Sequence, residues 1–96
     1  DGLRALVGAP NFALLQRHAV EVLVVDDAEA IAAMRLAWER LKIVIELSSA
    51  IVLAAVLRHR ARFAGRRVGL IVSGGNVDLD ALPWTGVAVS ASPARA

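Results

Sequence analysis

The fold is decided by residues 68–76, which run Val68-Gly69-Leu70-Ile71-Val72-Ser73-Gly74-Gly75-Asn76. The first part of this stretch, residues 68–72, is apolar or glycine throughout and shows no alternation with polar residues. A strand without alternation is typical of a sheet that is covered on both faces, and such sheets are usually parallel. The stretch therefore predicts a buried strand over residues 68–72 that ends at a polar, glycine-rich turn.

Upstream of this strand, helical and β-branched patterns alternate. Helices are expected at residues 11–18, 27–41 and 50–63, and short β-branched strands at residues 21–25 and 43–45. Pro10 can open the first helix, Asp26 or Asp27 can cap the second, and Ser48 or Ser49 can cap the third. The order helix, strand, helix, strand, helix, strand predicts an α/β fold.

The apolar surface of the second and third helices indicates how they pack. In the second helix a broad apolar face is formed by Ile31, Met34, Leu36, Ala37, Trp38 and Leu41. The third helix is apolar on nearly every side in its first two turns, so it should be buried on all sides, and Gly65 should follow its end. Such a helix and such a strand need more covering layers than three helices supply. We therefore expect the chain to be part of a larger α/β domain.

Composition excludes several classes of protein. The 96 residues are 57 % hydrophobic and 21 % charged, carry a formal charge of +2 and contain no Cys. Intrinsic disorder, a disulfide scaffold and a thiolate metal site are thereby excluded. The longest apolar stretch, residues 50–57, is well short of the ~18–20 residues that a membrane span needs. The sequence starts at Asp1 without an initiator Met or a signal-peptide pattern, so it is expected to be an internal piece of a larger protein.

A basic cluster follows the third helix. Its members are Arg58, Arg60, Arg62, Arg66 and Arg67. A solvated helix end explains them, since cations are favoured at a helix C-terminus; the alternative is a phosphate or nucleic-acid patch. The chain has only two Phe and two Trp, and none is expected to be interleaved with the cluster, so base stacking would have no platform. We therefore expect no nucleic-acid partner.

The Ser-Gly-Gly-Asn turn, residues 73–76, is the strongest candidate for a binding site. Ligands of open α/β sheets bind at the carboxyl ends of strands, and paired glycines let backbone pass close to other atoms. A structural tight turn remains the alternative. A nucleophilic role for Ser73 is not expected, because no glycine precedes it at the spacing of a nucleophile elbow and only His18 and His59 could serve as bases.

Several separated motifs together resemble a known family. They are Asp1-Gly2-Leu3, residues 38–46 (WERLKIVIE), residues 49–57 and residues 72–79 (VSGGNVDL). In order and spacing they are similar to the C-terminal part of the serine/threonine dehydratase, serine racemase and 3-hydroxyaspartate dehydratase family, from residue 1 to about Trp84. These are pyridoxal-phosphate (PLP) enzymes of the tryptophan-synthase-β type, fold type II.

The resemblance implies an architecture. Residues 1–89 would be the C-terminal portion of the large PLP-binding domain, a partial three-layer α/β sandwich, and residues 90–96 a frayed tail. The whole enzyme would be a cytoplasmic homodimer that acts on a small amino-acid substrate and binds neither nucleic acid nor membrane.

The resemblance also implies which residues contact the cofactor. The serine at the position of Ser73 hydrogen-bonds the pyridine nitrogen of PLP, with Gly74 beside it, and the glutamate at the position of Glu46 lies next to the ring. The alternatives are that Ser73 only caps the turn, and that Glu46 pairs with Lys42 or an arginine. The chain departs from the family at Leu47, where Pro is usual, and at Ser49, where Gly is frequent, which leaves the placing of Glu46 open.

Weaker correspondences concern activators. In nucleotide-activated members, residues at the positions of Asn76 and Lys42 contact ATP; otherwise they are a turn residue and an exposed cation. Mg or Ca is a further possible activator, but the chain itself is expected to hold no metal ligand, because Asp1-Gly2 only follows the metal-binding loop.

The resemblance implies a lyase for the whole enzyme. Serine, threonine or 3-hydroxyaspartate would be converted to a 2-keto acid and ammonia, and residues 79–84 lean toward hydroxyaspartate. The alternatives are an amino-acid (serine) racemase and an inactive truncated or binding fragment. Lys42 is the only Lys and matches no Schiff-base motif, so the chain is expected to contain no catalytic residue and to be inactive alone.

Overall fold

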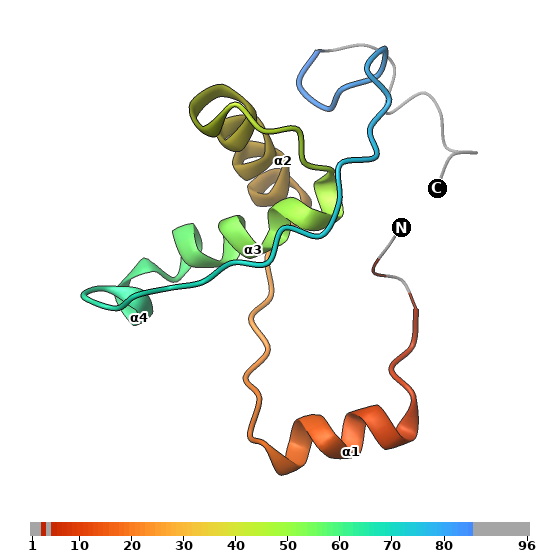
Figure 1. Ribbon diagram of the computed structural model, residues 1–96, viewed down its shortest axis with the longest axis vertical. Helices are drawn as coiled ribbons and strands as arrows, with labels where there is room; N and C mark the ends of the chain where they lie inside the picture. The colour runs from red at the N-terminus through yellow and green to blue at the C-terminus, as the bar shows by residue number, and fades with distance from the viewer. Residues whose placement is uncertain (1–2, 4, 86–96) are drawn as a thin grey trace.

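The computed structural model describes residues 3 and 5–85 and is shown in Figure 1. Its elements are α1 (Ala9–Arg17), α2 (Asp27–Leu36), the π-helical turn η1 (Ala37–Leu41), α3 (Leu47–Arg58) and α4 (Arg60–Phe63). The radius of gyration is 15.1 Å, whereas a compact domain of this length has about 12–13 Å. Figure 1 shows the reason: α1 stands apart from the other helices, at the end of extended connections. The chain is therefore an open structure whose packed part is α2, η1 and α3.

The start of α2 follows from a local sequence signal. The Asp26 carboxylate accepts a hydrogen bond from the Glu29 backbone N–H at 2.7 Å, and the Glu29 carboxylate accepts one from the Asp26 N–H at 2.9 Å. This reciprocal capping box satisfies two N–H groups that the helix leaves unpaired. The prediction of a cap at Asp26 or Asp27 is confirmed, with Asp26 as the cap.

Helices α2 and α3 pack together through small side chains. The buried cluster consists of Ala33, Met34, Ala37, Ile45, Ala50 and Ala54, all at most 3 % exposed. Alanines let two helix backbones approach closely, so burial is concentrated in a narrow seam. Glu29 and Arg58 pair at 2.7 Å and join the start of α2 to the end of α3.

The predicted apolar face of residues 27–41 is correct only in part. Met34 and Ala37 are buried as expected, but Leu36 is 37 % exposed and Leu41 is 61 % exposed. The π-helical turn η1 explains Leu41, because a wider turn shifts each later side chain around the axis relative to an α-helix. Lys42 then ends η1 with φ 59°, a left-handed conformation.

Trp38 anchors the chain that leaves η1. Its indole Nε1 donates a hydrogen bond to the Ile45 carbonyl oxygen at 3.0 Å. The ring also meets Trp84 edge to face, with centroids 5.2 Å apart and planes at 80°. These two contacts hold residues 43–45 and the end of the described chain against the same helix.

The third helix differs from its prediction at both ends. It begins at Leu47, and its cap residue Glu46 makes no side-chain capping bond, so the prediction of Ser48 or Ser49 as the cap is wrong. Both serines lie inside the first turn instead. The expected continuous helix is broken at His59, which separates α3 from α4, and Gly65 follows with φ 72° as a stop signal.

The predicted strands are not found in the part of the chain that the structure describes. Residues 21–25, 43–45 and 68–72 are extended, but none is assigned as a strand. Val22 is 78 % exposed and Ile71 82 % exposed, so the burial on both faces that was expected within a larger domain is not confirmed by this chain. A strand requires a neighbouring strand for its hydrogen bonds. Here residues 68–73 run back along α3 (Figure 1), and the sheet layer of the expected sandwich is not formed.

Two further expectations concern the C-terminal tail and membrane-spanning helices. Residues 90–96, expected to be a frayed tail, lie outside the described residues. Within residues 3 and 5–85, no helix combines the length and apolar character needed to cross a membrane.

Candidate functional site

Two extended segments meet at the N-terminus of α3. The backbone N–H of Glu46 donates a hydrogen bond to the Gly74 carbonyl oxygen at 3.0 Å. One residue earlier, the N–H of Ser73 donates to the Ser49 hydroxyl oxygen, also at 3.0 Å. The Ser-Gly-Gly-Asn turn is thus tied by its backbone to the first turn of α3.

The two glycines are required by this close approach. A Cβ atom on Gly74 would overlap the Glu46 carboxylate, and a Cβ on Gly75 would lie 2.5 Å from the Val44 carbonyl oxygen. Neither glycine has a positive φ, since Gly65 is the only glycine with one in the described chain. Glycine is therefore needed at these positions because neighbouring atoms approach the backbone closely, and not because the backbone adopts an unusual conformation.

Two polar side chains are presented beside these glycines. Ser73 is exposed, and its hydroxyl has no hydrogen-bond partner among the residues that the structure describes. Glu46 is half-buried, and it belongs to none of the ion pairs formed within residues 3 and 5–85. The alternative pairing of Glu46 with Lys42 or an arginine is therefore not found there. A hydroxyl and a carboxylate remain available to a ligand.

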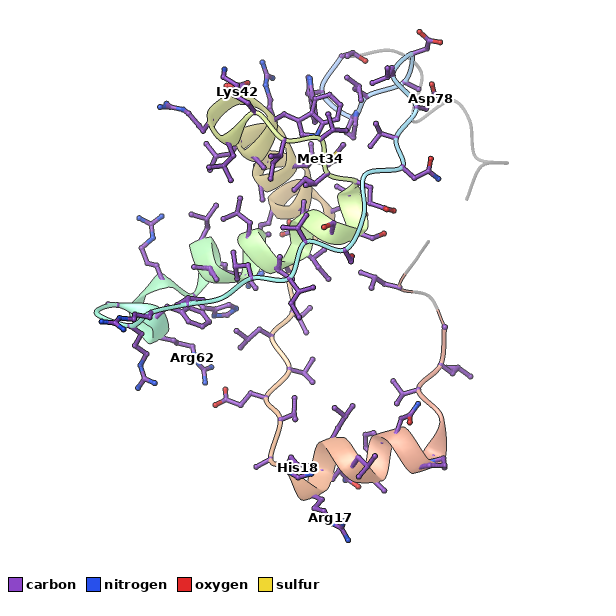
Figure 2. The ribbon with its side chains drawn as sticks, in the orientation of Figure 1. Arg17, His18, Met34, Lys42, Arg62 and Asp78 are labelled. Carbon is purple, nitrogen blue, oxygen red and sulfur yellow. The ribbon has the colours of Figure 1, made fainter. Side chains whose placement is uncertain are left out.

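A cavity of about 240 Å³ adjoins this junction. Its lining includes Glu46, Asn76 and Met34, with Asp78 at the side of the following turn. Figure 2 shows Met34 and Asp78 around this region, while Lys42 lies at the end of η1. Of the predicted site residues, Glu46 and Asn76 line this cavity, whereas Ser73, Gly74 and Lys42 do not. Gly74 is joined to Glu46 through the backbone hydrogen bond, and Ser73 directly precedes it.

Sequence reasoning missed Ser49. Its side chain is 1 % exposed, and it is the only buried polar residue in the described chain. The Ser49 hydroxyl accepts a hydrogen bond from the Ser73 N–H, so Ser49 belongs to the junction, although the sequence suggested it only as a helix cap. The departure from glycine at this position, noted in the sequence, was the signal that could have directed attention to it.

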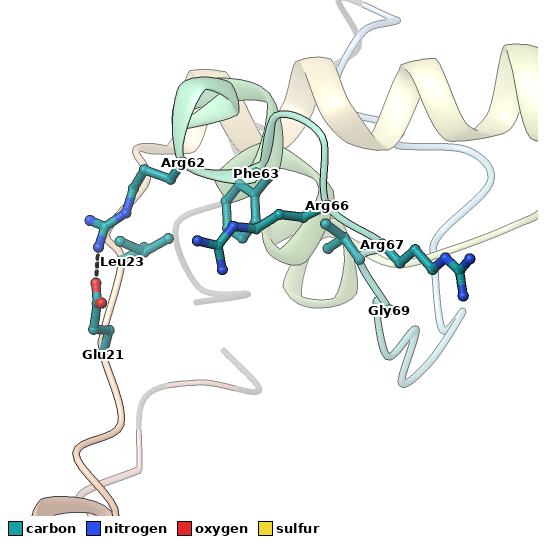
Figure 3. A pocket seen from close by; sticks show the side chains of 8 residues that line it. Glu21, Leu23, Arg62, Phe63, Arg66, Arg67 and Gly69 are labelled. Carbon is teal, nitrogen blue, oxygen red and sulfur yellow. Dashed lines mark hydrogen bonds and ion pairs between the residues drawn. The ribbon is translucent and has the colours of Figure 1, made fainter.

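The basic cluster lies at the opposite end of α3. Figure 3 shows a cavity of about 690 Å³ there, lined by Leu23, Phe63, Arg66 and Arg67, and an ion pair between Arg62 and Glu21. Phe63 lies between Arg62 and Arg66, so the expectation that no aromatic residue is interleaved with the cluster is wrong. Arg58 is engaged with Glu29. These pairs agree with the prediction of a solvated helix end.

The two histidines lie away from the junction. His18 follows α1, at the far end of the molecule in Figure 2. His59 lies at the break between α3 and α4, where its Nε2 atom is buried without a hydrogen-bond partner in the described structure. Among the same residues, no group of three or more His, Asp or Glu side chains is placed to hold a metal ion.

Comparison with known proteins places this chain in a family. The family described as pyridoxal-phosphate dependent enzyme matches residues 1–74. A β-hydroxyaspartate dehydratase of Paracoccus denitrificans is 48 % identical over 84 residues, which cover 88 % of this chain and 27 % of the relative. A serine racemase of Dictyostelium discoideum is 43 % identical, with 85 % of this chain and 26 % of the relative covered. The chain belongs to the family of pyridoxal-phosphate dependent enzymes.

Solved structures agree with this membership. The crystal structure of serine racemase from Dictyostelium discoideum superposes with a TM-score of 0.75 at 44 % identity, covering 82 % of this chain and 27 % of that one. Maize serine racemase gives a TM-score of 0.74 at 41 % identity, covering 83 % and 27 %. The chain thus spans about a quarter of the length of the relatives that it matches.

The residues of the junction fit one side of a PLP site. The Ser73 hydroxyl can donate a hydrogen bond to a ring nitrogen or accept one from it, and no described protein atom competes for it. The Glu46 carboxylate lies against Gly74, the residue that follows Ser73. A lysine for the covalent link to the cofactor does not fit here, because the only Lys, Lys42, is exposed at the end of η1.

Proposed function

We propose that this chain forms the wall of the cofactor site that faces the pyridine nitrogen, in an enzyme that deaminates β-hydroxy amino acids. The observation that supports the proposal is the free, exposed Ser73 hydroxyl beside two glycines, of which Gly74 is hydrogen-bonded to Glu46 and Gly75 lies against Val44. In this proposal the Ser73 hydroxyl binds the ring nitrogen and Glu46 lies beside the ring. Gly74 has no side chain, which leaves room for the Glu46 carboxylate. PLP supplies an electron sink for the carbon that carries the amino group.

The contribution of Ser73 is electrostatic. A neutral hydroxyl opposite the ring nitrogen leaves that nitrogen largely unprotonated, whereas a carboxylate would hold a proton there and strengthen the sink. A moderate sink is sufficient when hydroxide leaves from the neighbouring carbon. Overall, the substrate loses water, and hydrolysis of the resulting imine then yields a 2-keto acid and ammonia.

The substrate proposed first is 3-hydroxyaspartate, with serine and threonine as alternatives. The relatives that support it are the Paracoccus β-hydroxyaspartate dehydratase and a Pseudomonas L-threo-3-hydroxyaspartate ammonia-lyase, which is 38 % identical over 74 residues. Serine racemase is an equal alternative activity, supported by the Dictyostelium relative and both solved structures. The same wall serves both activities, because they differ in acids and bases that the junction does not contain.

Further parts of the proposal concern activators and assembly. Asn76, which lines the cavity next to Glu46, and Lys42, which directly follows η1, are proposed to contact a nucleotide activator such as ATP, with Mg or Ca bound by residues outside this chain. The whole enzyme is proposed to be a homodimer. By itself the chain is proposed to be inactive, since neither a suitably placed lysine nor a phosphate-binding loop is part of it.

The test uses the full-length enzyme that contains this chain. Purified protein is incubated with 3-hydroxyaspartate, serine and threonine, keto acid is measured with a coupled dehydrogenase, and D-serine is measured by chiral chromatography. The proposal expects keto acid, and it expects Ser73→Ala to weaken PLP binding by about two- to tenfold, the value of one hydrogen bond. An S73A enzyme that retains PLP as tightly as the parent would contradict the role of Ser73. D-serine without keto acid would decide for the racemase.

A further inference from the structure

Ser49 holds a buried hydroxyl where the first turn of α3 contacts the Ser-Gly-Gly-Asn turn. It lies in the first turn of α3, where its own N–H donates to the Glu46 carbonyl oxygen at 3.0 Å. Its side chain is 1 % exposed. A buried hydroxyl is costly unless it forms a hydrogen bond, and this one accepts the N–H of Ser73 at 3.0 Å. The bond spans 24 positions of sequence, so it fixes tertiary structure.

Two hydrogen bonds enclose the Ser73–Gly74 dipeptide. On one side the Ser73 N–H is held by Ser49, and on the other the Gly74 carbonyl oxygen is held by the N–H of Glu46. Both anchors belong to the N-terminal end of the same helix. The direction of the Ser73 side chain is therefore set relative to α3, although the glycines that follow it are intrinsically flexible.

The Ser73 hydroxyl itself takes no part in this arrangement. It is exposed and lacks a partner within the described residues, while the backbone on both sides is fixed. Holding a reactive or binding group through its supporting neighbours, and leaving the group itself free, is how binding sites are preorganised. We infer that Ser49 is a positioning residue, which aims the Ser73 hydroxyl at the ring nitrogen through the Ser73 backbone. This inference rests on the proposed function of Ser73.

The inference has a structural consequence that is independent of the cofactor. Loss of the Ser49 hydroxyl leaves the Ser73 N–H without its acceptor, so its hydrogen exchange should accelerate by about tenfold, since a bond of roughly 1.4 kcal/mol is a factor of ten. Exchange at this amide is measured by NMR or by fragmentation mass spectrometry in full-length protein freed of PLP. Ser49→Ala removes a single oxygen and retains the Cβ atom. S49G takes its place should S49A fail to fold.

The control is Ser48→Ala, which removes a hydroxyl from the same helical turn. Ser48 makes no hydrogen bond to Ser73, so exchange at Ser73 should be the same in S48A as in the parent. If S49A leaves the exchange at Ser73 unchanged, the hydrogen bond does not hold the turn in solution and the inference is overturned.

A double-mutant cycle tests the consequence for the cofactor. The dissociation constant of PLP is measured for the parent, S49A, S73A and S49A/S73A. A residue that acts through Ser73 weakens PLP binding two- to fivefold in the parent background and adds nothing in the S73A background. An equal loss in both backgrounds would show that Ser49 does not act through Ser73, and no loss in the parent background would show that it positions nothing.

The same measurements separate the two proposals. If S73A binds PLP like the parent, the proposed function of Ser73 has failed, whatever the exchange data show. If S73A binds PLP weakly while S49A binds it normally and exchanges quickly at Ser73, only the positioning role has failed.

Discussion

The backbone N–H of Glu46 donates a hydrogen bond to the Gly74 carbonyl oxygen at 3.0 Å, and the Glu46 carboxylate fills the space where a Gly74 side chain would lie. The two residues come from segments that are far apart in sequence. Their contact places the start of α3 directly against the Ser-Gly-Gly-Asn turn. Any side chain added to the turn therefore acts on Glu46 or on the chain before it.

The two glycines of the turn should respond differently to Ala. At Gly74 the obstructing atom is the end of a flexible side chain, so Gly74→Ala should displace the Glu46 carboxylate at little cost in stability. At Gly75 the obstacle is the Val44 backbone carbonyl, 2.5 Å away, which cannot rotate aside. Gly75→Ala should therefore destabilise the protein by about 1–3 kcal/mol, as overpacking does.

Thermal unfolding of the full-length protein without PLP, together with PLP titration, measures both effects. G75A should lower the unfolding midpoint clearly more than G74A. G74A should weaken PLP binding while its midpoint stays near that of the parent. The reverse order of midpoints would show that the turn does not sit against residues 44–46 as the structure has it.

Local signals predicted the helices, and contacts between distant residues escaped prediction. The cap of α2 depends on neighbouring residues, so the sequence predicted it at Asp26 or Asp27, and the structure has it at Asp26. The reciprocal bond from Glu29 was not predicted. The strand at residues 68–72 was predicted from its apolar run, but strands form only beside other strands, and Ile71 is left 82 % exposed.

The site was predictable to the extent that it resembles a family. Resemblance singled out Ser73, Gly74 and Glu46, and the structure brings these three together. Ser49 could not be assigned a role from local rules, because a serine near a helix start is most simply a cap. Its partner, the N–H of Ser73, is known only from the tertiary contact.

The capping box provides a prediction about stability. Asp26→Ala removes the acceptor for the Glu29 N–H and should cost about 0.5–2 kcal/mol. Asp27→Ala is the matched control. Asp27 is the first residue of α2 and contributes only through its charge near the helix N-terminus, typically 0.3–1 kcal/mol. In thermal or urea unfolding, the parent should therefore be the most stable, D27A less stable and D26A the least stable. Equal losses of stability in D27A and D26A would argue against the cap.

The hydrogen bond from Trp38 to Ile45 predicts an effect on the chain that leads into Glu46. Trp38→Phe keeps an aromatic ring near Trp84 but leaves the buried Ile45 carbonyl oxygen without its donor, which should cost about 1–3 kcal/mol. In Trp84→Phe an aromatic ring stays opposite Trp38 and this hydrogen bond is untouched, so the loss should be smaller. The unfolding midpoints of the two variants test this difference. A W84F protein as unstable as W38F would contradict the stabilising role of the hydrogen bond from Trp38 to Ile45.

The proposed nucleotide contacts can be tested against the structural roles of the same residues. Lys42 is exposed and has φ 59°, a conformation that costs a non-glycine residue about 1–2 kcal/mol and that asparagine tolerates better. Lys42→Asn should therefore leave the unfolding midpoint unchanged or raise it, while removing the charge that would attract a phosphate group. If Lys42 contacts ATP, K42N loses the ATP activation of the full-length enzyme but keeps its activity without ATP.

Asn76→Ala, in the cavity beside Glu46, should likewise lose ATP activation if Asn76 shares that contact. Arg40→Gln is the control, because it removes a positive charge from the same turn without a proposed contact. ATP activation that survives both K42N and N76A, or that is lost equally in R40Q, would exclude these residues as a specific nucleotide site.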